Sequence, residues 1–159
     1  MGAFGGLTSM VNDEGCFVDA NVLVYAAIKA DVRHVACRDL IVNPACPVLY
    51  LSQQILAEFY STVTSPKRVT AAITSAEAIE FIETLTAYKH IVILPISADV
   101  HNRWLSLLKR RAVRGPIVFD FQIAATMLAH GVTKLITFNG VDFKGIAKIE
   151  ILEPVFTAA

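Results

Sequence analysis

The chain has 159 residues, of which 55% are hydrophobic and 18% charged, and its formal net charge is zero. This length and composition fit one domain with a large hydrophobic core, and no apolar run reaches the roughly 18 residues that a membrane-spanning helix needs. The equal numbers of acidic and basic residues give no overall attraction to nucleic acid, although a local basic patch would be enough to bind it.

The first fifteen residues are expected to form a flexible extension, followed by a single domain over residues 16–155. This extension is rich in glycine and lacks the basic region and long apolar core of a signal peptide. The cysteines Cys16, Cys37 and Cys46 form no CxxC pair. An odd count without a secretory signal predicts reduced thiols, buried as small apolar residues, in a cytoplasmic protein.

Short apolar runs alternate with longer helical runs along the chain. In chain order we expect a strand at 16–18, helices at 20–30 and 30–42, a strand at 48–52, helices at 53–65 and 75–90, a strand at 91–96, helices at 97–113 and 116–131, and strands at 134–138 and 149–152.

Local signals support several of these helix boundaries. Ser52 and Ser97 are expected N-caps, and the helix over 116–131 opens with Pro and closes with Gly, as helices commonly do. Ser75 is followed three residues later by Ala78, so no capping box is expected there.

The expected strands are almost wholly apolar, which indicates a sheet covered on both faces. Strands separated by helices favour right-handed crossovers and parallel pairing. The predicted fold is therefore α/β, a three-layer α/β/α sandwich around a mostly parallel sheet. In such sheets the functional site lies beyond the carboxyl ends of the strands.

Four acids can reach that edge of the sheet. Asp19 follows the first strand, Glu58 lies about two turns into the helix after 48–52, Asp120 lies in the first turns of the helix over 116–131, and Asp142 follows the strand at 134–138. Alone, Asp19 could cap a helix, Glu58 could be solvated, and Asp142 could be a turn residue. Asp120 is harder to dismiss, because it shares a helix face with apolar residues.

Converging acids repel one another, and their pKa values rise unless a cation is present. Carboxylate oxygens are preferred ligands of Mg²⁺ and Mn²⁺, and such ions promote phosphodiester hydrolysis without a protein nucleophile. The sequence contains no GxSxG elbow, no phosphate-binding GxxxxGK[ST] loop and no HExxH zinc motif.

In their order and spacing, the segments FVDANVLVYA, ILAEFY, FDFQIAATMLAHG and LITFNGVDF resemble those of PIN-domain proteins, and more narrowly those of VapC-type toxin ribonucleases. The resemblance covers residues 16 to about 153. It implies a PIN-like fold and an Mg²⁺-dependent endoribonuclease with Asp19, Glu58 and Asp120 as acidic core, with Mn²⁺ as a substitute. The family often carries an acid at the position of Asn139, so the fourth site residue is either Asp142 or Asn139.

The same resemblance adds expectations about neighbouring residues and partners. Family members often have Thr or Ser directly after the first Asp, whereas this chain has Ala20 and lacks that hydroxyl. Asn21, Thr137 and Asn139 are candidates for additional site residues. VapC-type relatives are expected to dimerise and to bind a cognate antitoxin, and the high apolar content independently predicts a surface that a partner or second copy covers.

A basic run precedes the helix that carries Asp120. Its cations are candidates for binding an RNA backbone, or else they are solvated residues favoured at a helix C-terminus; they are Lys109, Arg110, Arg111 and Arg114. Two other functions remain open beside the ribonuclease: a non-catalytic PIN module that binds RNA or protein, and a hydrolase of small phosphate esters.

Overall fold

The structure, a computed structural model, describes residues 14–157 and contains a five-stranded parallel sheet with strand order β3-β2-β1-β4-β5. The strands are β1 Cys16–Val18, β2 Leu49–Ser52, β3 Ile91–Leu94, β4 Lys134–Ile136 and β5 Glu150–Leu152. The helices are α1 Ala20–Ala27, α2 His34–Val42, α3 Gln53–Val63, α4 Ser75–Ala87, α5 Ala98–Arg110, α6 Ile117–Ala129 and the short 3-10 helix η1 Gly140–Phe143.

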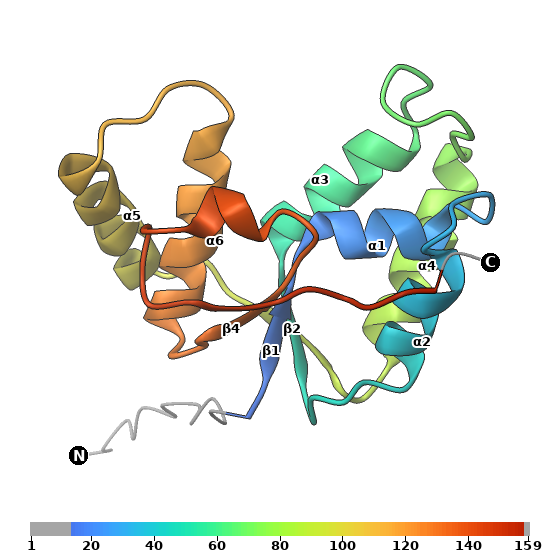
Figure 1. Cartoon of the computed structure of the whole chain (residues 1–159), viewed down its shortest axis with the longest axis horizontal. Helices are drawn as coiled ribbons and strands as arrows, with labels where there is room; N and C mark the ends of the chain where they lie inside the picture. Colours follow the sequence, from blue (N-terminus) through green and yellow to red (C-terminus); the bar gives the residue numbers. More distant parts are fainter. Residues whose placement is uncertain (1–13, 158–159) are drawn as a thin grey trace, which may run out of the picture.

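Helices cover the sheet from two sides, so the predicted three-layer α/β/α sandwich is confirmed. In Figure 1, α5 and α6 lie on one side of the strands, and α1, α2, α3 and α4 lie on the other. The core between the layers is built from large buried side chains that include Phe17, Phe59, Phe121 and Met127. Burying such side chains is the main favourable term in folding.

The parallel register aligns the carboxyl ends of the three central strands. Val18 pairs with Ile136, and Phe17 pairs with both Tyr50 and Leu135. The residues that follow β1 and β4, together with the end of β2, therefore meet at one edge. In the sheet, β2 lies on one side of β1 and β4 lies on the other. The connections at the carboxyl ends of β1 and β4 therefore lead away in opposite directions, and a crevice is expected between them.

The edge strands differ from the expectation of a fully covered sheet. In β3, Val92 and Ile93 are exposed, and β5 is only partly buried. Both are edge strands with a neighbouring strand on one side only, and their exposed positions show that the helices cover them less completely than the central strands. Only β1 and β2 are buried along their whole length.

Most predicted helices are present, with shorter ends. Ser52 and Ser97 are N-caps, as predicted, because their side chains accept hydrogen bonds from the N–H groups of Ile55 and Val100. The absence of a capping box at α4 was a wrong expectation: Thr74, one residue before Ser75, caps the helix and Glu77 completes the box. After α6, Gly131 takes a φ of 68°, which glycine adopts without strain.

The expectation of three reduced cysteines is wrong for two of them. Cys16 at the start of β1 and Cys46 in the connection before β2 form a disulfide, and Cys37 is a free, buried thiol. The Cys46 connection runs beside the start of β1, since the Cys16 N–H donates to the Val48 carbonyl. Spacing along the chain gave no indication of this proximity.

The expected N-terminal extension lies almost wholly outside the described residues. Of the expected extension, residues 1–15, only Glu14 and Gly15 are among the described residues. Within residues 14–157, no helix combines the length and apolar character needed to cross a bilayer.

Candidate active site

The first acid, Asp19, occupies the step from β1 into α1. It is almost fully buried, with 7% of its surface exposed. Its Oδ1 accepts a hydrogen bond from the Ala20 N–H at 2.7 Å, and its Oδ2 accepts from Thr137 Oγ1 at 2.7 Å and Asn21 Nδ2 at 3.2 Å. Burial raises the pKa of Asp19, the hydrogen bonds from Thr137 and the Ala20 N–H oppose the rise, and the charge of Asp142 adds to it. Asp19 is therefore both a helix cap and a desolvated carboxylate at the sheet edge.

Thr137, directly after β4, organises the groups around Asp19. It is completely buried, and its hydroxyl donates to Asp19 while accepting from Asn21 Nδ2 at 3.1 Å and from the Asn139 N–H at 2.9 Å. The hydroxyl that the sequence lacks at Ala20 is thus supplied from another strand. Of the three additional candidates, Asn21 and Thr137 donate hydrogen bonds to Asp19. Asn139 instead contacts Thr137, through its backbone N–H.

Glu58 projects from α3 and is held by Gln54, one turn earlier. Gln54 Nε2 donates to Glu58 Oε1 at 2.6 Å and to the Phe119 carbonyl of α6 at 3.0 Å. Gln54 Oε1 is buried and has no hydrogen-bond partner among the described residues. Burial raises the pKa of Glu58, as does Asp19, while Gln54 and Arg68 lower it. Gln54 therefore joins Glu58 to the helix that carries Asp120.

Asp120 lies in the first turn of α6 and is half-buried. Its helix neighbours Ile123, Ala124 and Met127 are buried in the core, so the predicted apolar stripe is present. Burial is the largest cause that raises the pKa of Asp120, and together with the charges of Asp142, Asp19 and Glu58 it raises this pKa to about 6. A carboxylate on this stripe is thus disfavoured in its charged form unless a cation compensates it.

The fourth acid, Asp142, is exposed in η1 and acts on its neighbours through its charge. It raises the pKa of both Asp19 and Asp120, so the structure brings these three acids and Glu58 into one electrostatically coupled group. Within residues 14–157, however, no three or more His, Cys, Asp or Glu side chains are already arranged to hold a metal ion. The carboxylates share an edge, but the expected metal-bridging arrangement is not preformed.

The sequence matches the model of the PIN domain family over residues 16–149, a range that includes all four acids. The chain belongs to the PIN domain family. A curated relative, Ribonuclease VapC24 of Mycobacterium tuberculosis, is 24% identical over 139 residues, covering 87% of this chain and 95% of that protein.

Solved structures agree with this PIN fold. VapC20 of Mycobacterium tuberculosis, described as a Sarcin-Ricin loop cleaving toxin, matches with a TM-score of 0.63 at 19% identity, covering 85% of this chain and 98% of the other. A toxin-antitoxin complex from Klebsiella pneumoniae matches with a TM-score of 0.58 at 19% identity, covering 89% of this chain and 99% of the other.

The predicted basic run of the PIN domain lies beside η1. Lys109 and Arg110 are in the last turn of α5, and Arg111 and Arg114 follow it. All four are exposed, and none of them forms an ion pair within the described part of the chain. Arg111 Nη1 donates to the Lys144 carbonyl at 3.2 Å, two residues from Asp142. The run therefore borders the acids, while Arg111 also has a structural contact.

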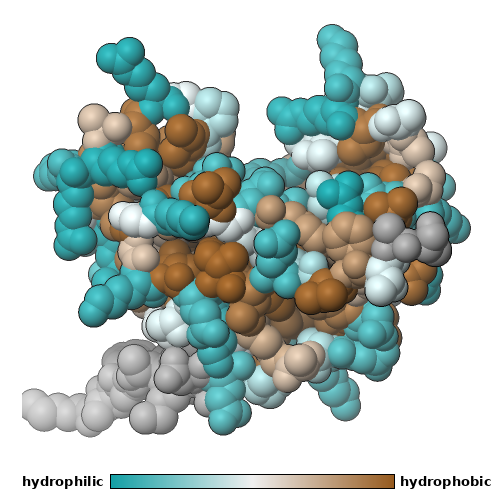
Figure 2. All heavy atoms as spheres, viewed as in Figure 1, coloured by the Kyte–Doolittle hydropathy of each residue, from teal (hydrophilic) through white to brown (hydrophobic). Residues whose placement is uncertain are grey.

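The surface is hollowed above the segments that carry the acids. Figure 2 shows a notch between two raised parts of the molecule, which correspond in Figure 1 to the α5–α6 and α3–α4 connections. The basic run lies on the α5–α6 side, and Lys67 and Arg68 lie in the α3–α4 connection.

Sequence reasoning missed one residue of this site. Gln54 lies on the same helix face as Glu58, and two polar residues one turn apart predict solvent exposure rather than a site contact. Its contact with Phe119 spans 65 residues of chain, so no local pattern could reveal it. The i, i+4 spacing of an amide and a carboxylate was the one available signal.

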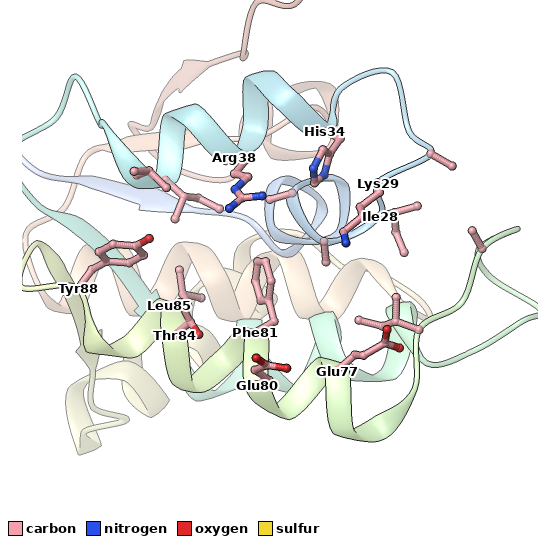
Figure 3. Close-up of a pocket in the computed structure, with 17 residues that line it drawn as sticks. Ile28, Lys29, His34, Arg38, Glu77, Glu80, Phe81, Thr84, Leu85 and Tyr88 are labelled. Atoms are coloured by element: carbon pink, nitrogen blue, oxygen red, sulfur yellow. The ribbon is translucent and has the colours of Figure 1, made fainter.

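A second hollow of the PIN domain lies away from the acids, between α1, α2 and α4. It has a volume of about 540 Å³ and an apolar floor that includes Ile28, Phe81 and Leu85. Figure 3 shows Lys29, His34 and Arg38 on the α1–α2 side, opposite Glu77 and Glu80 on α4. His34 Nδ1 is buried and has no partner among the described residues.

Proposed function

We propose that this PIN-domain protein is a VapC-type endoribonuclease, the toxin of a toxin–antitoxin pair, which hydrolyses RNA with Mg²⁺ bound by Asp19, Glu58, Asp120 and Asp142. The observation that carries the proposal is the mutual repulsion of these carboxylates at one sheet edge, which helps to raise the pKa of Asp120 to about 6. A folded protein that gathers four acids in this way gains most from a bound cation. Residues 16–155 form the nuclease domain in this proposal.

The donor set fits a hard divalent ion. Carboxylate oxygens beside an open notch leave room for the several waters that Mg²⁺ retains, and Mn²⁺ takes the same ligands. The buried, unpartnered Oε1 of Gln54 is available to accept a hydrogen bond from such a water. When bound, the ion would neutralise phosphate charge and lower the pKa of its water.

The surrounding residues hold the carboxylates in place. Thr137 and Asn21 orient Asp19 Oδ2, leaving the carboxylate few alternative positions, and Gln54 holds Glu58 against α6. Asn139, next to η1, is kept as a candidate for an additional ligand through its amide oxygen. The basic run Lys109, Arg110, Arg111 and Arg114 binds the RNA backbone beside the acids.

Cleavage of an RNA pool by the purified protein, mapped by sequencing of the new 5′ ends, tests this function. We expect cleavage in Mg²⁺, none in EDTA, recovery in Mn²⁺, and none with Asp120→Asn. Asp99→Asn is a matched control, because Asp99 is an exposed acid on α5 that pairs with Arg103, and it should cleave as the wild type does. EDTA-resistant cleavage would refute the metal-dependent mechanism.

One observation favours a second function, a non-catalytic PIN module that binds RNA or protein. No group of three or more metal-type side chains is preformed in the described residues. Specific RNA binding by the wild type, with no cleavage in Mg²⁺ or Mn²⁺ across the RNA pool, would establish this second function in place of the first.

The hollow between α1, α2 and α4 suits the proposed antitoxin. Its apolar floor fits the apolar face of a helix, and the opposite charges on its two sides would fix the direction of that helix. The unpartnered His34 Nδ1 is available for a polar contact. Phe81→Glu should abolish inhibition by the cognate antitoxin while RNA cleavage persists, and inhibition at the wild-type concentration would exclude this surface.

We also propose a homodimer in the cytoplasm, where the RNA substrate is found; the Cys16–Cys46 disulfide removes the support that reduced thiols would have given to this location. Six large exposed apolar side chains lie on the β3, α5 and α6 part of the molecule: Val92, Ile93, Ile96, Leu105, Ile117 and Phe119. Apolar surface of this kind commonly marks an interface. Light scattering should give the mass of two chains for the wild type and of one chain for Ile96→Glu, whose site is 60% exposed; a wild-type monomer at high concentration would refute the dimer.

A further inference from the structure

A recess with no role in the site described so far lies between the α1–α2 and α3–α4 connections. Its volume is about 340 Å³, at the lower end of the range of small-molecule pockets. The side chains of Tyr25, Arg33 and Arg68 line it, together with Asp31 and small or apolar residues. This size suits a single nucleotide rather than a folded segment of another protein.

Arg33 is held rigidly at the wall of this recess. Its Nε and Nη2 donate to the two carboxylate oxygens of Asp31, both at 2.7 Å, and the Arg33 N–H donates to Asp31 Oδ1 at 2.8 Å. The guanidinium carbon lies 3.4 Å from the centroid of the Tyr25 ring. Asp31 compensates the charge of Arg33, so the pair presents a fixed, flat surface with little net charge.

The aromatic part of this surface is connected to the acidic site. Tyr25 packs edge-on against Phe138, with ring centroids 5.2 Å apart. The Phe138 N–H donates to Asn21 Oδ1 at 3.4 Å, and Asn21 in turn donates to Asp19. Asn21 and Tyr25 are also one turn apart on α1, so the stack begins one helical turn from the residue that donates to the first acid.

Arg68 supplies the uncompensated positive charge. It is exposed on the α3–α4 connection, and its Nη1 donates to Thr62 Oγ1 at 3.4 Å. Its charge lowers the pKa of Glu58, which places it within electrostatic range of the acids. Within residues 14–157 it forms no ion pair, so its charge is free to meet a phosphate.

We propose that this recess is a nucleotide subsite, in which a base of the RNA stacks on the Arg33–Tyr25 surface and Arg68 contacts a phosphate of the same strand. The inference rests on the proposed ribonuclease function and extends it. Bases of single-stranded RNA are commonly bound by stacking on aromatic rings and guanidinium planes. An acidic peptide would require several free cations, whereas Asp31 compensates Arg33 and leaves Arg68 as the uncompensated cation among the lining residues.

Together with the basic run on the far side of the notch, the subsite defines the course of the substrate. The strand passes from Lys109–Arg114, over the acids, to the recess between the α1–α2 and α3–α4 connections. One base beside the cleavage point is then read by stacking, which favours an unpaired nucleotide at that position. Substrates would therefore be single-stranded or looped next to the bond that is cut.

Binding to two fluorescein-labelled probes tests the subsite. One is a 12-nucleotide single-stranded RNA, and the other has the same sugar–phosphate backbone without bases. All measurements use full-length protein carrying Asp120→Asn, so that the probe is not cleaved. Fluorescence anisotropy gives the affinity for each probe over a range of salt concentrations.

Tyr25→Leu should weaken binding of the normal RNA by about tenfold, the loss expected for one stacked base, and should leave the affinity for the abasic probe unchanged. Tyr25→Phe should restore binding, because it retains the ring. Arg68→Gln should weaken both probes and reduce the salt slope by about 0.7. Lys89→Gln is a matched control, since Lys89 is an exposed cation just before β3 at the opposite sheet edge, and it should change neither.

Equal effects of Tyr25→Leu on both probes would overturn the stacking role. If Tyr25→Leu loses its thermal unfolding transition, Arg33→Lys replaces it, because this variant keeps the charge and removes the planar group. It should likewise weaken binding of the normal RNA and leave the affinity for the abasic probe unchanged. Cleavage of RNA by the protein with Asp120 intact, together with unchanged probe affinities in every Asp120→Asn variant, would refute the subsite and leave the ribonuclease function standing. Labelled poly-glutamate serves as a third probe for the alternative: if the variants weaken its binding and leave both RNA probes unchanged, the recess binds an acidic peptide and the subsite is refuted. Base-dependent binding without cleavage by the protein with Asp120 intact would retain the subsite and refute the nuclease.

Discussion

A half-buried carboxylate on the apolar stripe of α6 stores unfavourable electrostatic energy when no cation is bound. The pKa of Asp120 is raised from 3.8 to about 6, chiefly by burial. The unfolded chain therefore ionises this group first, so stability is complete below about pH 4 and falls as the pH rises towards 6. Above that pH the destabilisation is constant.

Asp120→Asn should therefore raise the free energy of unfolding at pH 7.5 in EDTA by on the order of 1 kcal/mol, after allowance for solvent screening of a half-exposed group. At pH 4 the two proteins should unfold alike. Urea unfolding at both pH values measures the difference. A less stable mutant at pH 7.5 would mean that Asp120 acts as a structural cap.

Thr137 offers a second test at the level of one side chain. Its hydroxyl is shared by Asp19, Asn21 and the Asn139 N–H, so Thr137→Val leaves several buried polar groups unpaired. We expect a loss of about 1–3 kcal/mol in unfolding free energy and a tenfold to hundredfold loss of activity, as for other residues that orient ligands. Thr137→Ser should recover most of both. Full activity in the valine variant would contradict a positioning role.

The site residues divide into those visible in the sequence and those that are not. Asp19, after an apolar strand, and Asp120, on an apolar helix stripe, could be singled out because their neighbours are apolar. The hydrogen bonds of Thr137 to Asp19 and of Gln54 to Phe119 join residues 118 and 65 positions apart. Thr137 could be named as a candidate from the family resemblance, but only the folded chain brings such pairs together, so neither contact could be predicted.

Among the elements, the end of α5 carries the charges expected to track RNA. Arg110→Ala with Arg114→Ala should weaken binding of every RNA alike and reduce the slope of log affinity against log salt by about 1.4, or 0.7 for each lost contact. Arg111→Ala is kept separate, because Arg111 also binds the Lys144 carbonyl and its loss should loosen η1. If the double mutant keeps the wild-type salt slope, these cations do not bind RNA and are only solvated residues favoured at a helix C-terminus.

The order and type of the strands and long helices could be predicted, because apolar periodicity follows directly from which face is buried. The ends could not. α1 stops at Ala27 rather than residue 30, and the turn before α2 is stabilised by the Asp31–Arg33 pair. The helix η1 was expected to be a loop, since four residues are too few to show a period.

For the molecule as a whole, the Cys16–Cys46 disulfide closes a loop of about 30 residues at the end of β1 opposite to the acids. In the chain-entropy description such a bond contributes about 3–4 kcal/mol. Reduction should lower the unfolding free energy by up to this amount and leave RNA cleavage at 25 °C unchanged. Cys46→Ser provides the same comparison without a reductant, and unchanged stability in both would show that the bond adds nothing to the fold.

The four proposed site acids are carried by four separate elements spread from residue 19 to residue 142. During synthesis, a chain that has not yet passed η1 holds at most three of them, and β4, which supplies Thr137 to Asp19, is among the last segments to leave the ribosome. Under the proposed function, the chain would therefore be unable to cut RNA while it is still being made. Premature stop codons anywhere before residue 142 should therefore be harmless to a producing cell, and cloning without an inhibitor should select for them across that whole length.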